Sequence, residues 1–401
     1  MTGRDGAFHA ALAAIALLGA LAGALHPEPF PTDGDEAFQA ACIHASPDRF
    51  RAALLADAVH PPLDYVVDRL IERAAPGAAA RRIAPTLWGF LGVLVFGALL
   101  AARAGRFAGI AGALLFAFAL YRVSETRRLR PYPLAILLML AALFLLDRYL
   151  ARPSGTRLAA AFVLAVAAAW TLYFAGAVLL LAMVALVLED LGSEDAVRRR
   201  SGAGLLRFSP LIAAAGLLAA APLLPLLRAA AATHVRIAAP PEDPRRIARV
   251  FSYATVSPNA GYAFPPRMLF LAALLVGCGL IAAGTVAALR RPGCRFLVAW
   301  GYGGIALIEL VKRLHPHFDS FRYYVPAAVA LTALEAIAID RLRRRAGTAI
   351  AAGLLGVALL LLVPPLTRYY RYGIWYFSSG AGKPGIFRAA PPARPGAGTM
   401  P

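Results

Sequence analysis

The sequence has few charged residues and few cysteines, and each shortage excludes a class of protein. Only 16% of its 401 residues are charged and 60% are hydrophobic, whereas a soluble domain has about a quarter charged residues. The three cysteines are Cys42, Cys278 and Cys294, and no two of them have the CxxC spacing of a zinc or redox site. These shortages argue against a soluble enzyme and against redox chemistry.

Acidic residues are also scarce. The chain has 22 Asp and Glu against 41 Lys and Arg, which gives a net charge of +19. In a soluble protein such an excess would indicate nucleic-acid binding. Here most arginines lie in loops between apolar segments, and no basic helix interleaved with aromatic residues stands apart from them. Membrane topology explains the excess better, and no nucleic-acid partner is expected.

Two further features are missing. There is no glycine-rich phosphate loop of the P-loop or Rossmann type, so no nucleotide site is indicated. There is no internal repeat, and the apolar segments contain few charges, chiefly Glu309 and Glu335. Transporters place ionisable groups near the bilayer midplane and often contain inverted repeats. A transporter or a flippase for lipid-linked sugars is therefore the alternative hypothesis rather than the favoured one.

What the sequence has instead is a series of long apolar segments. A helix needs about 20 apolar residues to cross the 30 Å core of a bilayer. The sequence predicts an all-α polytopic membrane protein with about eleven transmembrane helices, and the first is a retained helix rather than a signal peptide. The predicted segments are 8–25, 84–101, 107–121, 133–150, 158–173, 174–190, 205–227, 268–289, 295–311, 324–340 and 347–363.

The membrane domain is predicted to span residues 1–363. Residues 364–401 are predicted to be an interfacial aromatic segment followed by a disordered tail. Residues 158–190 are too long for one ordinary span, so two helices joined by a very tight turn near Leu172 are expected.

The positions of the arginines predict the orientation. If the N-terminus lies inside, every inner loop is basic, as the positive-inside rule requires. The usage of Ala, Arg and Pro suggests a GC-rich bacterial genome and hence the bacterial cytoplasmic (inner) membrane, with loop 26–83 facing the periplasm or outside. The inner arginines are Arg103, Arg106, Arg148, Arg152, Arg157, Arg198, Arg199, Arg200, Arg207, Arg290, Arg291, Arg295, Arg341, Arg343, Arg344 and Arg345.

The large first outer loop, 26–83, is predicted to carry two amphipathic surface helices, at 47–59 and Leu63–Ala74. Both are expected to lie flat at the membrane surface. In the second helix the polar residues Asp64, Asp68, Arg69 and Glu72 lie opposite Leu63, Val66, Val67, Leu70 and Ile71.

Carboxylates gather at the start of this loop, immediately after the first apolar segment. Asp33, Asp35 and Glu36 include candidates for a general base, or for ligands of a divalent metal that steadies a leaving phosphate. The alternative is a helix N-cap. Further along, Asp57 and His60 precede Pro61-Pro62, which fix a rigid turn. This segment is either part of a substrate site or purely structural.

Several arginines lie on the side that the charge rule disfavours. Arg127 and Arg130 precede Tyr132 at the start of the fourth segment, and Arg322 follows His317 in a later outer loop. A bound anion such as phosphate would explain them, because Arg forms bidentate, charge-assisted bonds to phosphate oxygens. The alternative is that these side chains extend to the lipid headgroups as anchors. The spacing of His315 and His317 is a weak metal signal.

Taken in order, these motifs resemble the polytopic GT-C glycosyltransferases that use polyprenyl-phosphate sugars. The subgroup they resemble contains protein mannosyltransferases, aminoarabinose transferases and the galacturonosyltransferases of lipopolysaccharide. The chain departs from the family at Leu172-Tyr173, where members often have His before Tyr. The motifs that carry the resemblance are Asp35-Glu36-Ala37-Phe38, His60-Pro61-Pro62-Leu63, Arg81-Arg82, Arg130-Pro131-Tyr132-Pro133-Leu134 and Phe321-Arg322-Tyr323-Tyr324-Val325-Pro326.

The resemblance implies a membrane enzyme of cell-envelope biosynthesis. It would transfer a sugar, usually with inversion, from a polyprenyl-phosphate carrier to a lipid, polysaccharide or protein acceptor on the outer face. It implies that Asp35 is the catalytic base supported by Glu36, and that Arg130 and Arg322 bind the carrier phosphate. Asp33 is a second candidate for the base. A divalent metal is the one cofactor that the resemblance leaves open. A ligase that transfers whole oligosaccharides is a further alternative, because it would share the outer arginines.

Overall fold

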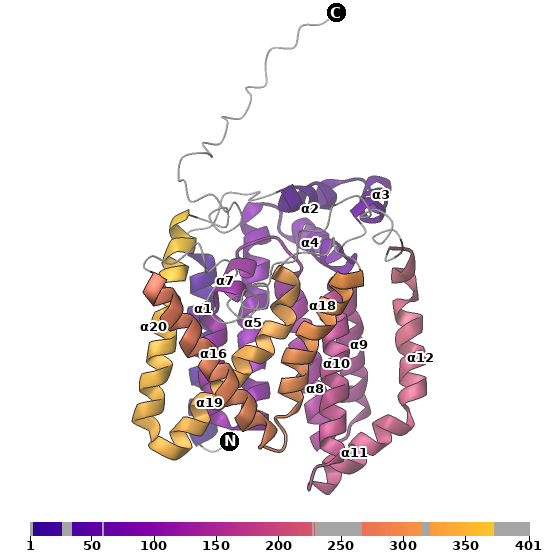
Figure 1. Ribbon diagram of the computed structural model, residues 1–401. Helices are drawn as coiled ribbons and strands as arrows, with labels where there is room; N and C mark the ends of the chain where they lie inside the picture. Colours follow the sequence, from indigo (N-terminus) through magenta and orange to yellow (C-terminus); the bar gives the residue numbers. More distant parts are fainter. Residues whose placement is uncertain are drawn as a thin grey trace, which may run out of the picture.

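The computed structural model describes residues 3–25, 34–57, 60–226, 228, 267–314 and 321–372, and every regular element in these ranges is a helix (Figure 1). Each of the eleven predicted segments is largely helical where it is described, but 107–121, 205–227 and 295–311 each run across more than one helix. The helices of the bundle are α1 (Gly3–Ala24), α5 (Ala78–Ala104), α6 (Arg106–Phe118), α7 (Leu120–Thr126), α8 (Tyr132–Ala151), α9 (Gly155–Thr171), α10 (Tyr173–Leu191), α12 (Ser209–Ala220), α16 (Arg267–Leu289), α17 (Phe296–Val298), α18 (Gly304–Leu314), α19 (Val325–Ala346) and α20 (Thr348–Tyr372).

The protein is a multi-pass membrane protein. Among the described residues, six helices are long and apolar enough to cross a bilayer, and α6 with α7, bent by 56° at their junction, would be a seventh. Two further apolar helices, Gly155–Thr171 and Thr348–Pro364, are shorter. The remaining two predicted segments fail this test: α19 carries charged residues, and the helix from 296 to 314 is interrupted by the π-helical residues Ala299–Gly303.

A layer of three short helices lies across one end of the bundle, at the top of Figure 1, which we call the upper end. These helices are α2 (Gly34–His44), α3 (Pro47–Asp57) and α4 (Leu63–Ala74). The last two are the predicted surface helices. The opposite, lower end carries α11 (Ala196–Arg207) and the turns between α16 and α17 and between α19 and α20 (Figure 1).

Helix α4 turns its polar face toward the protein. Asp64 and Asp68 are buried, whereas Val66 and Leu70 are exposed. The helix packs against α2, α5 and α9, so its acidic side meets other helices rather than water. Sequence periodicity correctly grouped the residues of each face, and the structure shows which face points inward.

The tight turn predicted within residues 158–190 is confirmed. Helix α9 ends at Thr171 and α10 begins at Tyr173, so Leu172 alone separates them. Leu172 has an extended backbone, with φ −154° and ψ 117°, and one extended residue is enough to reverse the direction of the chain here.

Helices α16 and α19 pack unusually closely. A Cβ atom added to Gly284 would lie 1.9 Å from the carbonyl oxygen of Leu334. Only a residue without a side chain allows this approach, as in other membrane helix pairs that meet at small residues. Sixteen consecutive residues of α19, from Val325 to Asp340, are buried, which makes this helix the centre of the bundle.

A buried ion-pair network joins four helices at the lower end. Arg103 of α5 contacts Asp147 of α8 at 2.6 Å and Asp190 of α10 at 2.7 Å. Arg198 of α11 lies 2.9 Å from both carboxylates. Two arginines therefore balance two aspartates, which is the condition under which buried charges are tolerated.

Candidate active site

The chain between α7 and α8 at the upper end is rich in buried arginine. The bend between α6 and α7 is made at Ala119, whose backbone leaves the helical region with ψ 127°. Helix α7 ends at Thr126, and Arg127, Arg128 and Arg130 follow with side chains 3%, 0% and 4% exposed. We call residues 127–130 the arginine loop. Such burial does not fit cations that extend to lipid headgroups, the alternative that the sequence allowed for Arg127 and Arg130.

Glu36 of α2 is fixed to the arginine loop. Its carboxylate is fully buried, pairs with the guanidinium of Arg82 at 2.7 Å, and accepts a hydrogen bond from the backbone nitrogen of Leu129 at 2.6 Å. Arg82 also donates to the backbone oxygen of Arg127 at 2.6 Å. Helix α2, the start of α5 and the arginine loop are therefore joined through two side chains. Arg82 belongs to a motif of the family resemblance but was not predicted as a site residue.

The predicted base, Asp35, is the second residue of α2. Because consecutive Cα atoms are about 3.8 Å apart, the anchoring of Glu36 fixes the backbone of Asp35 beside the arginine loop. The side chains of Asp35 and Asp57 lie outside the described part of the structure, as do the whole residues Asp33 and His317. Their predicted roles stay predictions.

A pair of buried aspartates lies next to this anchor. Gln39 of α2 donates through Nε2 to Oδ2 of Asp64 and to Oδ2 of Asp68, both at 2.6 Å. Burial raises the pKa of Asp64 to about 6, against the hydrogen bond from Gln39 and the charges of His60 and Arg130, which lower it. Burial, and then the charge of Asp64, raise the pKa of Asp68 well above its ordinary value.

From the sequence we expected these two aspartates on the solvent side of α4 and did not predict them as site residues. Their i, i+4 spacing, close to His60, was the available signal. The influence of His60 and Arg130 on Asp64 shows that two predicted residues lie near the pair.

The late motif around Arg322 reaches the same region. The short 3₁₀ helix η3 (Phe321–Tyr324) places Arg322 at 3.5 Å from Glu125 of α7. Tyr132, the first residue of α8, is buried and lies within electrostatic range of Arg322, Glu125 and Arg130. Arg322 is thus a neighbour in the fold of Arg130 and Tyr132, which lie almost two hundred positions earlier in the sequence.

The described side chains of this region carry an excess of positive charge. Five arginines face four carboxylates, and burial pushes two of those carboxylates toward their neutral form. That these arginines bind an anion such as phosphate stays a prediction from the sequence. The arginines are Arg82, Arg127, Arg128, Arg130 and Arg322, and the carboxylates are Glu36, Glu125, Asp64 and Asp68. Among the described residues, no three His, Cys, Asp or Glu side chains are grouped as a metal site.

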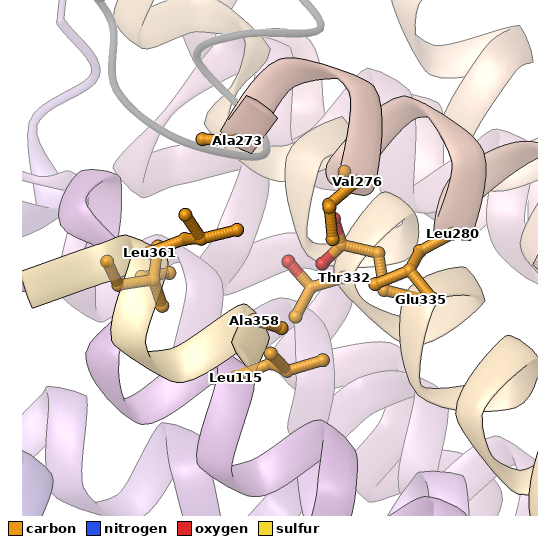
Figure 2. Close-up of a pocket in the computed structure, with 11 residues that line it drawn as sticks. Leu115, Ala273, Val276, Leu280, Thr332, Glu335, Ala358 and Leu361 are labelled. Carbon is orange, nitrogen blue, oxygen red and sulfur yellow. The ribbon is translucent and has the colours of Figure 1, made fainter. Parts of the chain in front are cut away.

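A separate cavity lies within the bundle, between α6, α16, α19 and α20. Figure 2 shows Thr332 and Glu335 among its otherwise mainly apolar lining. It offers ≈ 30 Å³, room for about two water molecules. This is too small for a sugar phosphate, and none of the predicted site residues lines it. The buried Glu335 is the feature of the described residues that best fits the transporter hypothesis.

No protein-family model matches the sequence, and no curated protein matches it. Solved structures do share its architecture. ArnT from Cupriavidus metallidurans in the apo state is 16% identical with a TM-score of 0.56, over 93% of this chain and 69% of ArnT. The structure of ArnT bound to undecaprenyl phosphate is 18% identical with a TM-score of 0.55, over 94% and 69%.

The oligosaccharyltransferase of Archaeoglobus fulgidus, solved with Zn and sulfate, is similar over 89% of this chain. It is 13% identical with a TM-score of 0.53, and the chain spans 52% of its length. At identities this low, the structural similarity establishes the fold alone. The chain therefore shares the fold of ArnT and of the archaeal oligosaccharyltransferase, and this is the fold that its motifs predicted.

Proposed function

We propose that the protein is a GT-C glycosyltransferase that moves a sugar from a polyprenyl-phosphate carrier to an acceptor on the outer face of the cytoplasmic membrane. The observation that carries the proposal is the buried arginine loop, held by Glu36 directly beside Asp35. A structure of the same fold was solved with undecaprenyl phosphate bound. A lipid carrier also fits a chain without a nucleotide motif.

The chemistry needs a base and an anion site on opposite sides of the sugar. Asp35 takes the proton from the acceptor hydroxyl while the oxygen of that hydroxyl forms a bond to the anomeric carbon. The bond from that carbon to the phosphate oxygen breaks, and polyprenyl phosphate leaves with the electron pair. Arg130 and Arg322 stabilise the negative charge that develops on the leaving phosphate. Attack in line with the departing group gives inversion.

The other residues position these groups. Glu36 holds α2 against the arginine loop, which keeps Asp35 near the phosphate site. Arg127 and Tyr132 line the donor side, whereas Asp57, His60 and His317 border the acceptor or donor entrance. Asp33 is the second candidate base, and with Asp35 it would supply the oxygens for a divalent metal.

The test uses the full chain in lipid nanodiscs with a panel of polyprenyl-phosphate monosaccharides and lipid, polysaccharide and peptide acceptors. Release of polyprenyl phosphate and labelling of the acceptor are both followed, with and without EDTA. Asp35→Asn and Asp33→Asn identify the base, and Glu194→Gln, an exposed acid at the lower end, is the matched control. We expect transfer by the unmodified protein and by the control, and a loss of at least a hundredfold in Asp35→Asn.

Undiminished transfer in Asp35→Asn with loss in Asp33→Asn would move the base to Asp33. Movement of the lipid-linked sugar across the bilayer without any transfer would replace the proposal with the flippase hypothesis.

A further inference from the structure

A second basic site lies at the lower end, away from the arginine loop. The last turns of α16 and α19 enclose a hollow of ≈ 280 Å³, whose apolar wall is formed by Ala287 and Ile337. Asp340 is its one carboxylate. The arginines that line it are Arg290, Arg291, Arg341, Arg344 and Arg345.

Asp340 organises part of this cluster without neutralising it. Its buried carboxylate accepts hydrogen bonds from Arg291 at 3.3 Å, Arg343 at 3.1 Å and Arg344 at 2.9 Å. The guanidinium groups of Arg291 and Arg344 also approach one another at Gly105, where each lies within 4 Å of the position of an added Cβ, at 3.9 and 3.8 Å. Both groups donate to Oδ2 of Asp340, so this one carboxylate holds them together, but it balances only one of the three arginine charges around it.

Three arginines of the hollow have no carboxylate partner in the described part of the chain: Arg290, Arg341 and Arg345. The neighbouring network of Arg103, Arg198 and two aspartates, by contrast, is balanced charge for charge. The positive-inside rule explains arginines scattered along the inner loops. It does not require five of them to line one hollow around a single acid.

We propose that this hollow binds the phosphate group of an anionic membrane lipid. The arginines offer bidentate donors to phosphate oxygens. Val286 and Leu289 of α16, next in sequence to the lining residues Ala287 and Arg290, are exposed, so a lipid held by its headgroup has a surface for the start of its acyl chains. Basic pockets between membrane helices on the inner side bind such headgroups in other proteins. The proposal is independent of the transferase function, because the site lies at the opposite end of the bundle.

The test titrates the full chain in a neutral detergent with a short-chain phosphatidylglycerol, and bound lipid is counted by native mass spectrometry. Short-chain phosphatidylcholine and inorganic phosphate are the comparison ligands. The pocket variant carries Arg290→Gln, Arg341→Gln and Arg345→Gln, which leave the bonds to Asp340 in place. The control variant carries Arg199→Gln, Arg200→Gln and Arg207→Gln, which removes three exposed arginines of α11 at the same end.

We expect saturable phosphatidylglycerol binding by the unmodified protein and the control. In the pocket variant we expect binding about a hundredfold weaker, at about fivefold for each arginine. A variant with lysine at the same three positions keeps the charge and tests geometry, because lysine lacks the planar fork of arginine. We expect it to bind about tenfold more weakly than the unmodified protein.

Equal binding by the pocket and control variants would overturn the site. Equal weakening in both variants would show attraction to overall charge and would also overturn it. Inorganic phosphate at millimolar concentration could displace the lipid and stabilise the protein as well as the lipid does. That result would overturn the proposal that the phosphate group belongs to a membrane lipid.

Discussion

The carboxylate of Glu36 accepts a hydrogen bond from the backbone nitrogen of Leu129 at 2.6 Å, although 93 positions separate the two residues in the sequence. A side chain of the upper layer thus satisfies a backbone group of the arginine loop. The same carboxylate pairs with Arg82. Glu36 thus fixes the first turn of α2, and with it the backbone of Asp35, to the arginine loop, while Gln39 holds the same helix to α4.

Substitution of Glu36 is therefore expected to act first on stability. Glu36→Ala removes the carboxylate that accepts from Arg82 and from the Leu129 nitrogen, and removal of one partner of a buried ion pair costs about 3–5 kcal/mol. Glu36→Gln keeps one acceptor oxygen and should lose less. Thermal unfolding in nanodiscs measures both, with Glu194→Gln as control. Identical melting temperatures in Glu36→Ala and the control would show that α2 is held by something else.

Substitution of Arg130 is expected to weaken donor binding. The buried Arg130→Lys side chain keeps its charge but loses the planar fork that grips two phosphate oxygens. We expect the KM for the polyprenyl-phosphate sugar to rise about tenfold or more, the equivalent of about 1.4 kcal/mol. Arg200→Lys on exposed α11 is the matched control. An unchanged KM in Arg130→Lys would remove this residue from the donor site.

The aspartate pair of α4 makes stability depend on pH. Burial raises the pKa of Asp64 from 3.8 to about 6 and raises that of Asp68 strongly. Above pH 3.8 the folded protein then holds protons that the unfolded chain has released. Stability is therefore highest below that value and falls as pH rises through about 6 and on through the titration of Asp68.

Asp68→Asn should reduce this fall, because the neutral amide keeps an oxygen for Gln39 and cannot ionise. The measurement is the melting temperature from pH 4.5 to 8, taken as the difference between the unmodified protein and the variant so that other titrations cancel. Asp48→Asn, an exposed acid of the same layer, is the control. A difference that stays constant across this range would show that the pair ionises normally.

The contact of α16 with α19 predicts a contrast between two glycines of one helix. Gly284→Ala places a methyl group against the Leu334 backbone, and overpacking of this kind costs about 1–3 kcal/mol. Gly279→Ala meets nothing within 4 Å and removes a helix-weakening residue, for a gain of up to about 1 kcal/mol. The two melting temperatures should therefore shift in opposite directions. Equal shifts would contradict the close packing.

The helical segments were predictable from the sequence because lipid tolerates only a backbone whose polar groups are satisfied within the helix. The turn at Leu172 followed in the same way, from the length of residues 158–190. The number of membrane crossings is harder to predict from hydropathy, because α19 is buried by protein rather than by lipid and carries Glu335 and Asp340.

The candidate site was only partly predictable. Arg127, Arg130 and Arg322 stood out because they lie on the side that the charge rule disfavours. Arg128 and Arg82 stand in the same motifs but were not predicted as site residues, since the contact of Arg82 with Arg127 and the burial of Arg128 depend on the fold. Asp64 and Asp68 were assigned to water because periodicity fixes which residues share a face but not which face meets the protein.

The orientation of α4 has a consequence for how the upper layer meets its surroundings. With Asp64 and Asp68 inside and Val66 and Leu70 outside, α4 presents an apolar face to its surroundings. The position of the upper layer then depends on lipid or detergent that covers this face of α4. Leu70→Glu, a change that would improve the solubility of an ordinary surface helix, would here lift this corner of the layer away from the bilayer.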